Sequence, residues 1–331
     1  MVVMKLNRIT CLLAIIIVGS VITQSNCFDV RSLDAIKIDP KHSALQHDEI
    51  TRHRSHSIHQ LFNSSALAGT DTAPLSNISY HFSSQYAASF YVQYYGTWTN
   101  TQISIINTLI ANIGNTTWFN IQKTYYYQAT DTSPKVNTAG PLTLGGAWIL
   151  SSGLGNALTG TIIPNRFIYY INNGILPNDP GGIYLWLNSA SVTESNSVIN
   201  GSFLTNYCGY HYRFQITGIN YMYGFIGNAG RFIGQGCDPS AINPTLSPND
   251  DLGVDAMASI IAHEIVEAMS DPFGNAWYDS NGAENADKCA WNFGTVSQSP
   301  NGANYNLLAG GRYYLIQQNW NAILQACAQS A

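Results

Sequence analysis

Aromatic and branched apolar residues are grouped in short blocks between polar turns from residue 78 onward. The block Phe90–Tyr95 predicts a strand, because such residues favour the pleated, half-buried surface of a sheet. Thr99 follows as a helix cap, and apolar side chains then recur at the three- and four-residue spacing of a helix face. We therefore expect a strand followed by an amphipathic helix whose inward-facing side chains are Ile103, Ile106, Leu109 and Ile110.

Similar blocks continue through the rest of this region. Residues 183–187 and 221–226 predict two more strands, and a helix that contains Ile168 is expected to end at residues 172–174, Asn-Asn-Gly. Another helix is expected to begin beside the capping and acidic side chains of residues 248–251. About 250 residues suit a single domain, or two small lobes with this last helix between them. The predicted fold class is α+β: a single globular domain with a mixed sheet and a central helix.

That central helix has charged groups on an otherwise apolar surface. Only 10% of the chain is charged, yet six of its 19 acidic residues fall between Glu264 and Asp287. Apolar residues surround His263, Glu264 and Glu267 on most of the helix circumference, and a helix that is apolar nearly all round is buried. Buried charges must be paired or bound to metal. The alternative is a solvated helix face with exposed carboxylates, but the apolar surroundings favour a metal site.

The spacing of these charged residues resembles that of a zincin active-site helix. His263 and Glu267 are four residues apart, so their side chains lie on one face about 5–6 Å from each other and can bind one ion. Glu264 is rotated by about 100° from His263 and can act as general base on a water bound to that ion. Zincins have a second histidine at the position of Glu267, so the match is partial. Calcium and manganese also accept carboxylates, and the histidine favours zinc as the cofactor.

The third ligand is expected beyond the helix. Glu284 lies seventeen residues after Glu267 and is the preferred ligand, with Asp287 to orient it and His211 as the rival. Zinc with an open position would acidify a water and polarise a carbonyl while Glu264 takes the proton, which is the chemistry of peptide-bond hydrolysis. Zinc with no open position would be structural. A metal site therefore does not by itself define an enzyme.

The N-terminal residues have the pattern of a secretory signal peptide. Lys5 and Arg8 precede an apolar core at residues 11–22 that is short for a membrane span, and we expect cleavage by residue 27. An uncleaved anchor is the alternative. Residues 28–75 hold five of the eight histidines and few aromatic residues, which is typical of a polar leader or propeptide. The folded domain is expected at residues 76–331.

Two further features agree with secretion. Four sequons predict N-glycosylation at Asn63, Asn77, Asn115 and Asn200. Beyond the signal region four cysteines allow three disulfide connectivities: Cys208, Cys237, Cys289 and Cys327. We prefer Cys208–Cys237 with Cys289–Cys327, because these pairs close loops of about thirty to forty residues. The first pair also flanks a predicted strand.

Charge and hydropathy limit the partners. The net charge is −5 and there is no basic patch, which argues against nucleic acid. No second long apolar run follows the signal region, so we expect a soluble extracellular monomer without membrane contact after cleavage. The expected partner is a peptide or an extracellular protein substrate.

Several segments taken in order resemble one family. They are residues 208–211 (Cys-Gly-Tyr-His), 221–228, 248–257, 271–278 and 311–315. Together they identify the chain as similar, from about Tyr80 to Cys327, to the EXORDIUM-like, phosphate-induced secreted proteins described mainly from plants. The resemblance implies a role in extracellular growth and cell-expansion signalling, with no catalytic activity assigned.

The chain departs from the plant members at the central helix. They have small and apolar residues at the positions of His263 and Glu264, whereas microbial relatives share the His-Glu pair and a later segment, Gly-x-Glu-x-x-Asp-x-Cys, here residues 282–289. Two functions remain: a secreted zinc-dependent metallopeptidase-like hydrolase, or a non-catalytic extracellular EXORDIUM-type protein with a structural or vestigial metal. Stoichiometric metal together with hydrolysis of a protein substrate would separate them.

Overall fold

A computed structural model of the chain describes residues 30–33, 78–80, 87–130, 132–137, 139–159, 161–197 and 200–331. The predicted signal peptide, most of the predicted leader and the sequons at Asn63 and Asn77 lie outside these described residues. The sequons at Asn115 and Asn200 lie within them, and both asparagines are exposed as glycosylation requires.

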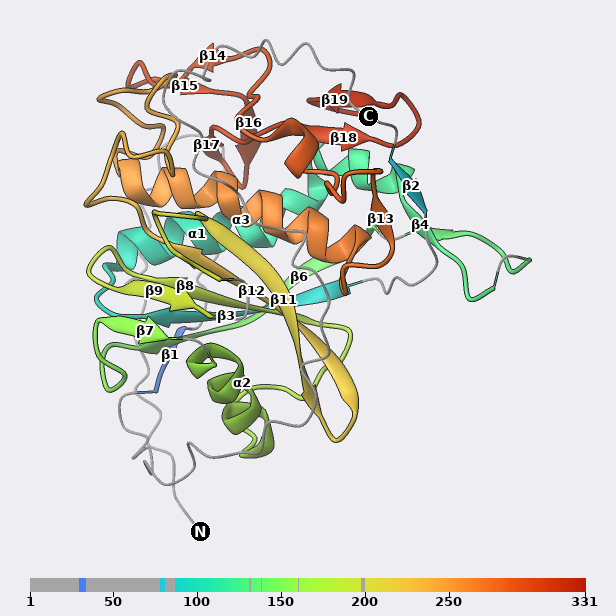
Figure 1. The fold of residues 1–331 in the computed structure, drawn as a ribbon. Coiled ribbons are helices and arrows are strands. Elements are labelled where there is room, and N and C mark those ends of the chain that lie inside the picture. The colour runs from blue at the N-terminus through green and yellow to red at the C-terminus, as the bar shows by residue number, and fades with distance from the viewer. Residues whose placement is uncertain are drawn as a thin grey trace, which may run out of the picture.

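A six-stranded sheet forms the centre of the fold (Figure 1). In spatial order its strands are β1 (Val30–Ser32), β6 (Ala139–Leu150), β3 (Ala87–Tyr95), β8 (Ile183–Asn188), β12 (Ile219–Gly227) and β11 (Gly209–Ile216). Neighbouring strands are parallel from β1 to β12, and only β11 is antiparallel to its neighbour. The predicted mixed sheet is therefore confirmed, with a mainly parallel core.

Three helices cover this sheet: α1 (Asn100–Asn112), α2 (Ile162–Asn172) and α3 (Leu252–Ser270). Figure 1 shows α1 and α3 on one face and α2 on the other. Because both faces are covered, every residue of β8 is buried, as expected for a parallel strand in the middle of a layered fold. The predicted start of α1, end of α2 and start of α3 agree with the structure, including a capping box at Thr99 and the positive φ of Gly174 after α2.

Short strands and 3₁₀ turns complete the structure. One small sheet contains β10 (Gly201–Ser202), β9 (Thr193–Asn196) and β7 (Ala157–Thr159). The two-stranded pairs are β13 (Trp277–Tyr278) with β2 (Ser79–Tyr80), β14 (Ser297–Gln298) with β15 (Asn304–Tyr305), β16 (Leu307–Ala309) with β17 (Arg312–Tyr314), β18 (Asn319–Asn321) with β19 (Ala326–Ala328), and β4 (Tyr126–Tyr127) with β5 (Val136–Asn137). The 3₁₀ turns are Ile113–Asn115, Phe119–Thr124 and Asp287–Cys289.

The C-terminal hairpins enclose α3 from the side opposite the sheet (Figure 1). As a result, all α3 residues from Gly253 to Ser270 are buried, although the helix carries three charged or titratable side chains in its second half. The prediction of a buried helix is thus confirmed. Charged groups on α3 cannot be solvated by pointing outward, so their partners must come from neighbouring elements.

Two disulfides join segments around this helix. Cys208 is bonded to Cys237, and Cys289 is bonded to Cys327. Both pairs are those preferred from the sequence. The second disulfide connects the 3₁₀ turn after α3 to strand β19, so it ties the region that follows the helix to the C-terminal hairpin.

Three strands of the central sheet were not expected from the sequence. Strand β1 comes from residues 30–32, inside the predicted leader, and pairs with β6 at one edge of the sheet. Strand β6 contains Pro141, Gly145 and Gly146, which weaken any strand prediction. Side chains at the two glycines would meet aromatic rings, because a Cβ atom at Gly145 would lie 2.5 Å from the ring of Tyr91, and one at Gly146 would lie even closer to the ring of Trp148. The third is β11, which carries His211.

Candidate metal centre

Helix α3 is held in position at its N-terminus and by a close contact with the sheet. Asp251 caps the helix, and its Oδ1 accepts a hydrogen bond from the backbone amide of Val254 at 3.0 Å. Its Oδ2 accepts from the Gln102 side chain at 2.9 Å, which links α3 to α1. These contacts fix the N-terminal end of α3 relative to α1.

Gly209 allows α3 to approach strand β11 closely. A Cβ atom at this position would lie 2.7 Å from Cγ2 of Ile260, 2.9 Å from the carbonyl oxygen of Phe225 and 3.2 Å from Oε1 of Glu264. Any larger residue would therefore push the helix away from the strand. His211 is two residues further along β11, and side chains two apart on a strand point to the same face. The glycine thus brings α3 within reach of His211.

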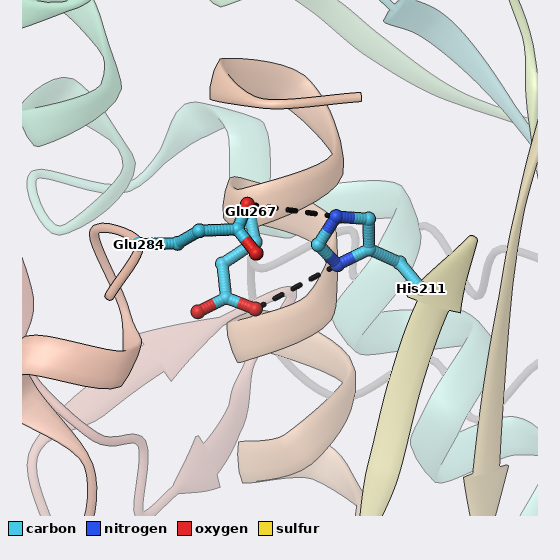
Figure 2. A group of neighbouring side chains, drawn as sticks. All are labelled: His211, Glu267 and Glu284. Atoms are coloured by element: carbon cyan, nitrogen blue, oxygen red, sulfur yellow. Dashed lines mark ion pairs between the residues drawn. The ribbon is translucent and has the colours of Figure 1, made fainter. Parts of the chain in front are cut away.

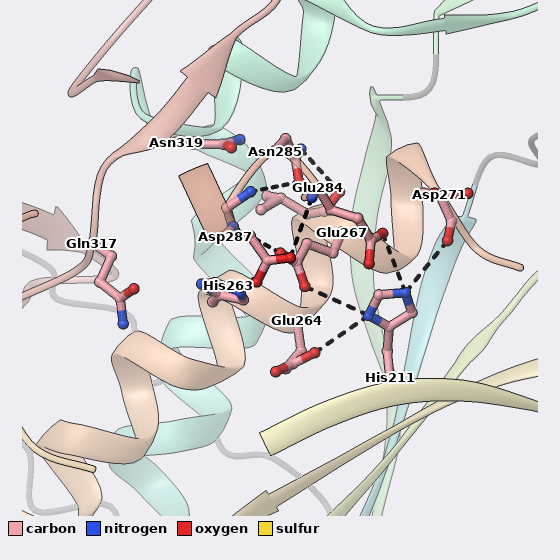
Figure 3. A network of polar contacts seen from close by, with 12 residues as sticks. His211, His263, Glu264, Glu267, Asp271, Glu284, Asn285, Asp287, Gln317 and Asn319 are labelled. Carbon is pink, nitrogen blue, oxygen red and sulfur yellow. Dashed lines mark hydrogen bonds and ion pairs between the residues drawn. The ribbon is translucent and has the colours of Figure 1, made fainter. Parts of the chain in front are cut away.

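His211 lies among three carboxylates, of which Figure 2 shows Glu267 and Glu284, and Figure 3 also shows Glu264. Its Nδ1 is 3.3 Å from Oε2 of Glu264 and 3.7 Å from Oε2 of Glu267. Its Nε2 is 3.6 Å from Oε1 of Glu284. Each of His211, Glu267 and Glu284 offers a ligand atom, and the three atoms lie within 4.8 Å of one another. A tetrahedral zinc site separates its nitrogen and oxygen ligands by about 3.3 Å and uses one imidazole nitrogen. Glu267 and Glu284 face different nitrogens of His211, so a side chain must turn for all three residues to bind one ion.

His263 forms a second group on the other side of Glu267 (Figure 3). Its Nε2 is 2.8 Å from Oε1 of Glu267 and 3.7 Å from Oδ1 of Asp287. His263, Glu267 and Asp287 also place one ligand atom each within 4.8 Å of one another. The predicted i, i+4 contact between His263 and Glu267 is therefore present.

The segment after α3 is fixed by hydrogen bonds to the helix. The backbone amide of Asp287 donates to Oε1 of Glu267 at 2.9 Å, and the Asn285 side chain donates to the carbonyl oxygen of Val266 at 3.3 Å. Gln122 donates to the same carbonyl at 2.7 Å and accepts from Asn285 at 3.2 Å. These contacts fix the segment that carries Glu284 and Asp287, which belong to the two groups that share Glu267.

The cluster is buried almost completely. His211 is 6% exposed, and the exposures of His263, Glu264, Glu267 and Glu284 lie between 0% and 1%. Among the described residues, no lysine or arginine forms an ion pair with Glu264, Glu267 or Glu284; their charged neighbours are histidines and other carboxyl groups. Oε1 of Glu264, Oε2 of Glu267 and Oε1 of Glu284 have no hydrogen-bond partner in the described part of the chain. Such orphaned buried oxygens are costly unless a cation binds them.

The pKa values of the buried carboxyl and imidazole groups in this cluster are shifted from their usual values. Burial raises the pKa of Glu284 well above its usual value, and the charges of Glu267 and Asp271 raise it further. Burial and the negative charge of Asp287 raise the pKa of Glu267 to about 7, while the nearby His263 acts to lower it. For His263, burial acts to lower the pKa, but Glu267 and Asp287 outweigh it and raise the pKa well above its usual value. Without a cation, the raised pKa values therefore favour protonated forms of His263, Glu267 and Glu284.

The structure divides the residues predicted as one site into two groups. Glu267 is common to both; Glu284 lies with His211, and Asp287 lies with His263. Glu264, the predicted general base, contacts His211. The sequence ranked His211 only as a rival ligand, and it did not single out Asn285 or Gln122. The alternation of Tyr210, Tyr212, Phe214 and Ile216 is a strand signal that could have placed His211 on β11.

The fold and the site define a mixed-sheet α+β protein whose buried helix carries a histidine–carboxylate cluster. Residues 78–330 match the phosphate-induced protein 1 conserved region. The chain therefore belongs to the phosphate-induced protein 1, or EXORDIUM-like, family. This establishes the family resemblance inferred from the sequence; the zincin likeness of α3 stays a prediction.

Two relatives come from Arabidopsis thaliana. Protein EXORDIUM-like 3 is 34% identical over 176 residues, which are 46% of this chain and 50% of the relative. Protein EXORDIUM-like 5 is 27% identical over 297 residues, or 77% of this chain and 78% of the relative. The chain thus spans about half the length of the first relative. No solved structure matches the chain.

Two findings bear on the predicted localisation. The two disulfides are consistent with an oxidising compartment such as the extracellular space. Among the residues that the structure describes, none of the helices combines the length and apolar character that a bilayer crossing requires.

Proposed function

We propose that this protein is an extracellular EXORDIUM-type protein that binds zinc in the buried cluster on α3, and that the ion has a structural role. The first ligands are His211, Glu267 and Glu284. This set keeps two of the three residues predicted from the sequence and replaces His263 with His211. The observation that carries the proposal is the pair of buried oxygens, Glu267 Oε2 and Glu284 Oε1, that face His211 without a hydrogen-bond partner among the described residues.

Burial favours a structural ion over a catalytic one. A catalytic zinc needs an open position where water and substrate can bind, whereas structural sites are closed by protein ligands. Here Glu264 and Glu284 are each 1% exposed, and Glu267 is 0% exposed. A polypeptide substrate has little access to such a cluster. The ion would instead neutralise carboxylates that hold α3, β11 and the segment after α3 together.

Peptide hydrolysis is the second candidate, and the position of Glu264 favours it. Its Oε2 lies 3.3 Å from His211, while its Oε1 has no hydrogen-bond partner in the described part of the chain. A general base beside a zinc ligand has this placement. The substrate would be a peptide or an extracellular protein, as expected from the sequence.

Metal analysis of the secreted, purified chain tests the structural role. After treatment with a chelator and dialysis against zinc, we expect at least one zinc per chain. We also expect zinc to raise the free energy of unfolding in urea, by about 2.7 kcal/mol when free zinc is a hundred times its dissociation constant. Retention of no zinc and no stabilisation would contradict the proposal.

Two variants sharpen this test. Glu284→Gln keeps the size of the side chain but removes a charged ligand, so zinc should stabilise this variant less than it stabilises the wild type. Glu194→Gln changes a carboxyl group that is equally buried but hydrogen-bonded to two tyrosines outside the cluster, so its response to zinc should match the wild type. Equal responses of both variants would mean that zinc binds elsewhere.

The catalytic candidate has its own measurement. Zinc-loaded protein is incubated with a generic protein substrate, and Glu264→Gln is compared with the wild type at equal zinc content. Loss of a general base lowers turnover by roughly 10²–10⁴. Hydrolysis that disappears in the variant would establish the peptidase; no hydrolysis by zinc-loaded wild type leaves the structural role.

A further inference from the structure

Glu267 faces both histidines of the cluster with different oxygen atoms. Oε1 is 2.8 Å from Nε2 of His263, and Oε2 is 3.7 Å from Nδ1 of His211 (Figure 3). A carboxylate whose two oxygens point to two separate nitrogen donors has the geometry of a bridge between metal ions.

Each histidine also has a carboxylate of its own. Oε1 of Glu284 lies 3.6 Å from Nε2 of His211, the ring nitrogen other than the one that Glu267 faces, and Oδ1 of Asp287 lies 3.7 Å from Nε2 of His263. The two groups share only Glu267, and each places three ligand atoms within 4.8 Å. Three protein ligands are enough to hold one transition-metal ion in each group.

The balance of charge in the cluster distinguishes one ion from two. When ionised, Glu264, Glu267, Asp271, Glu284 and Asp287 carry five negative charges around two neutral histidine ligands. One divalent ion would leave three of these charges uncompensated in a region where most side chains are 0–1% exposed. Two divalent ions would leave one, and Asp271 already accepts two backbone hydrogen bonds. The orphaned oxygens of Glu267 and Glu284 would both gain a cation.

We propose that the cluster is a dinuclear metal centre, with one divalent ion at His211 and Glu284, a second at His263 and Asp287, and Glu267 as the bridging carboxylate. This inference rests on the proposed zinc binding and adds a second ion to it. Bridged ions of this kind lie about 3.5–4 Å apart. The centre would join β11, α3 and the segment after α3 through one shared side chain.

The number of ions per chain is the first measurement. The full secreted chain is stripped with a chelator, reloaded with zinc, dialysed and measured for metal and protein content. We expect two zinc ions per chain. One ion per chain would overturn the dinuclear centre and leave the proposed function intact, whereas no zinc would overturn both.

Single histidine variants locate the two ions. His211→Ala and His263→Ala should each retain one zinc per chain, because each removes the nitrogen ligand of one group only. Glu194→Gln, the buried carboxyl group outside the cluster, should retain two. Loss of both ions in a folded His263→Ala variant, or retention of both in either histidine variant, would overturn the assignment.

A spectroscopic measurement on the wild type covers the case in which a variant does not fold. The chelator-treated chain is loaded with Mn²⁺, and electron paramagnetic resonance is recorded at full loading. Two ions bridged by Glu267 should give a spin-coupled spectrum, which one ion or two distant ions cannot give. A six-line spectrum of isolated Mn²⁺ at saturation would overturn the bridge.

Discussion

Glu194 shows at the scale of a single residue how a buried carboxyl group is accommodated without a cation. It lies on β9 and is 3% exposed. The hydroxyl of Tyr207 donates to its Oε2, and the hydroxyl of Tyr210 donates to its Oε1 at 3.2 Å. Both oxygens therefore have donors, in contrast to Glu267 and Glu284. The same residue type is satisfied by hydrogen bonds here and by ions, as we propose, in the cluster.

The titration of Glu194 predicts a pH dependence of stability. Burial raises its pKa to about 7, although the hydrogen bonds from Tyr207 and Tyr210 act to lower it. Between its unfolded pKa and this value the folded state keeps a proton that the unfolded state has lost, so stability falls as pH rises. With about 1.4 kcal/mol for each pKa unit, the loss is on the order of 3 kcal/mol.

Urea unfolding at several pH values between about 4.5 and 8 measures this loss. Other buried groups also titrate, so the comparison is between the wild type and Glu194→Gln, which cannot ionise. The difference in free energy of unfolding between the two proteins should change with pH in this interval and become constant above it. Parallel stability curves would show that Glu194 titrates normally.

The contact between α3 and β11 is the critical feature at the scale of secondary-structure elements. It depends on Gly209, where a Cβ atom would lie 2.9 Å from the carbonyl oxygen of Phe225 and 2.7 Å from Ile260. The Ile260 side chain can rotate, but the backbone oxygen belongs to the neighbouring strand β12 and cannot. The helix or the strand must therefore shift if any side chain is added.

We expect Gly209→Ala to lower the free energy of unfolding by about 1–3 kcal/mol, the usual cost of overpacking. It should also weaken zinc binding, because His211 and the carboxylates of α3 would move apart. Gly181→Ala is the matched control: a Cβ atom there would meet only Oδ1 of Asp179 at 3.5 Å. That change should be neutral or stabilising by up to about 1 kcal/mol. Equal stabilities of the two variants would contradict the close approach.

The two disulfides act at the scale of the whole molecule. Cys208–Cys237 begins beside β11, and Cys289–Cys327 begins just after the segment that carries Glu284 and Asp287. The strand and the segment that contribute ligands from outside α3 are therefore each adjacent to a covalent link. This arrangement restrains both sides of the cluster.

Replacing Cys289 and Cys327 together by serine is expected to lower the free energy of unfolding by roughly 3–4 kcal/mol, from the loop of 38 residues that the bond closes. Urea unfolding without reductant gives the value. A reductant should then destabilise the wild type more than this variant, which retains only Cys208–Cys237. A loss below about 1 kcal/mol would mean that the bond does not restrain the unfolded chain.

The sequence by itself determined the elements whose signals are local. Helices α1, α2 and α3 were predicted from apolar periodicity and capping residues such as Thr99 and Asp251, and the burial of α3 from its apolar circumference. The contact of His263 with Glu267 follows from helical spacing alone, since both lie on one helix. The preferred disulfide pairing and the family resemblance were likewise inferred from residues that can be recognised in the sequence alone.

Only the tertiary structure decided which carboxylate belongs to which histidine. His211 precedes Glu264 by 53 residues, and no spacing rule connects a strand to a helix across that distance. Their contact depends on β11 being the strand beside β12 and on Gly209 letting α3 approach it. The places of Glu284 and Asp287 likewise depend on hydrogen bonds from the following segment to α3. Local patterns specify elements, whereas a cluster shared by three elements is specified by how they pack.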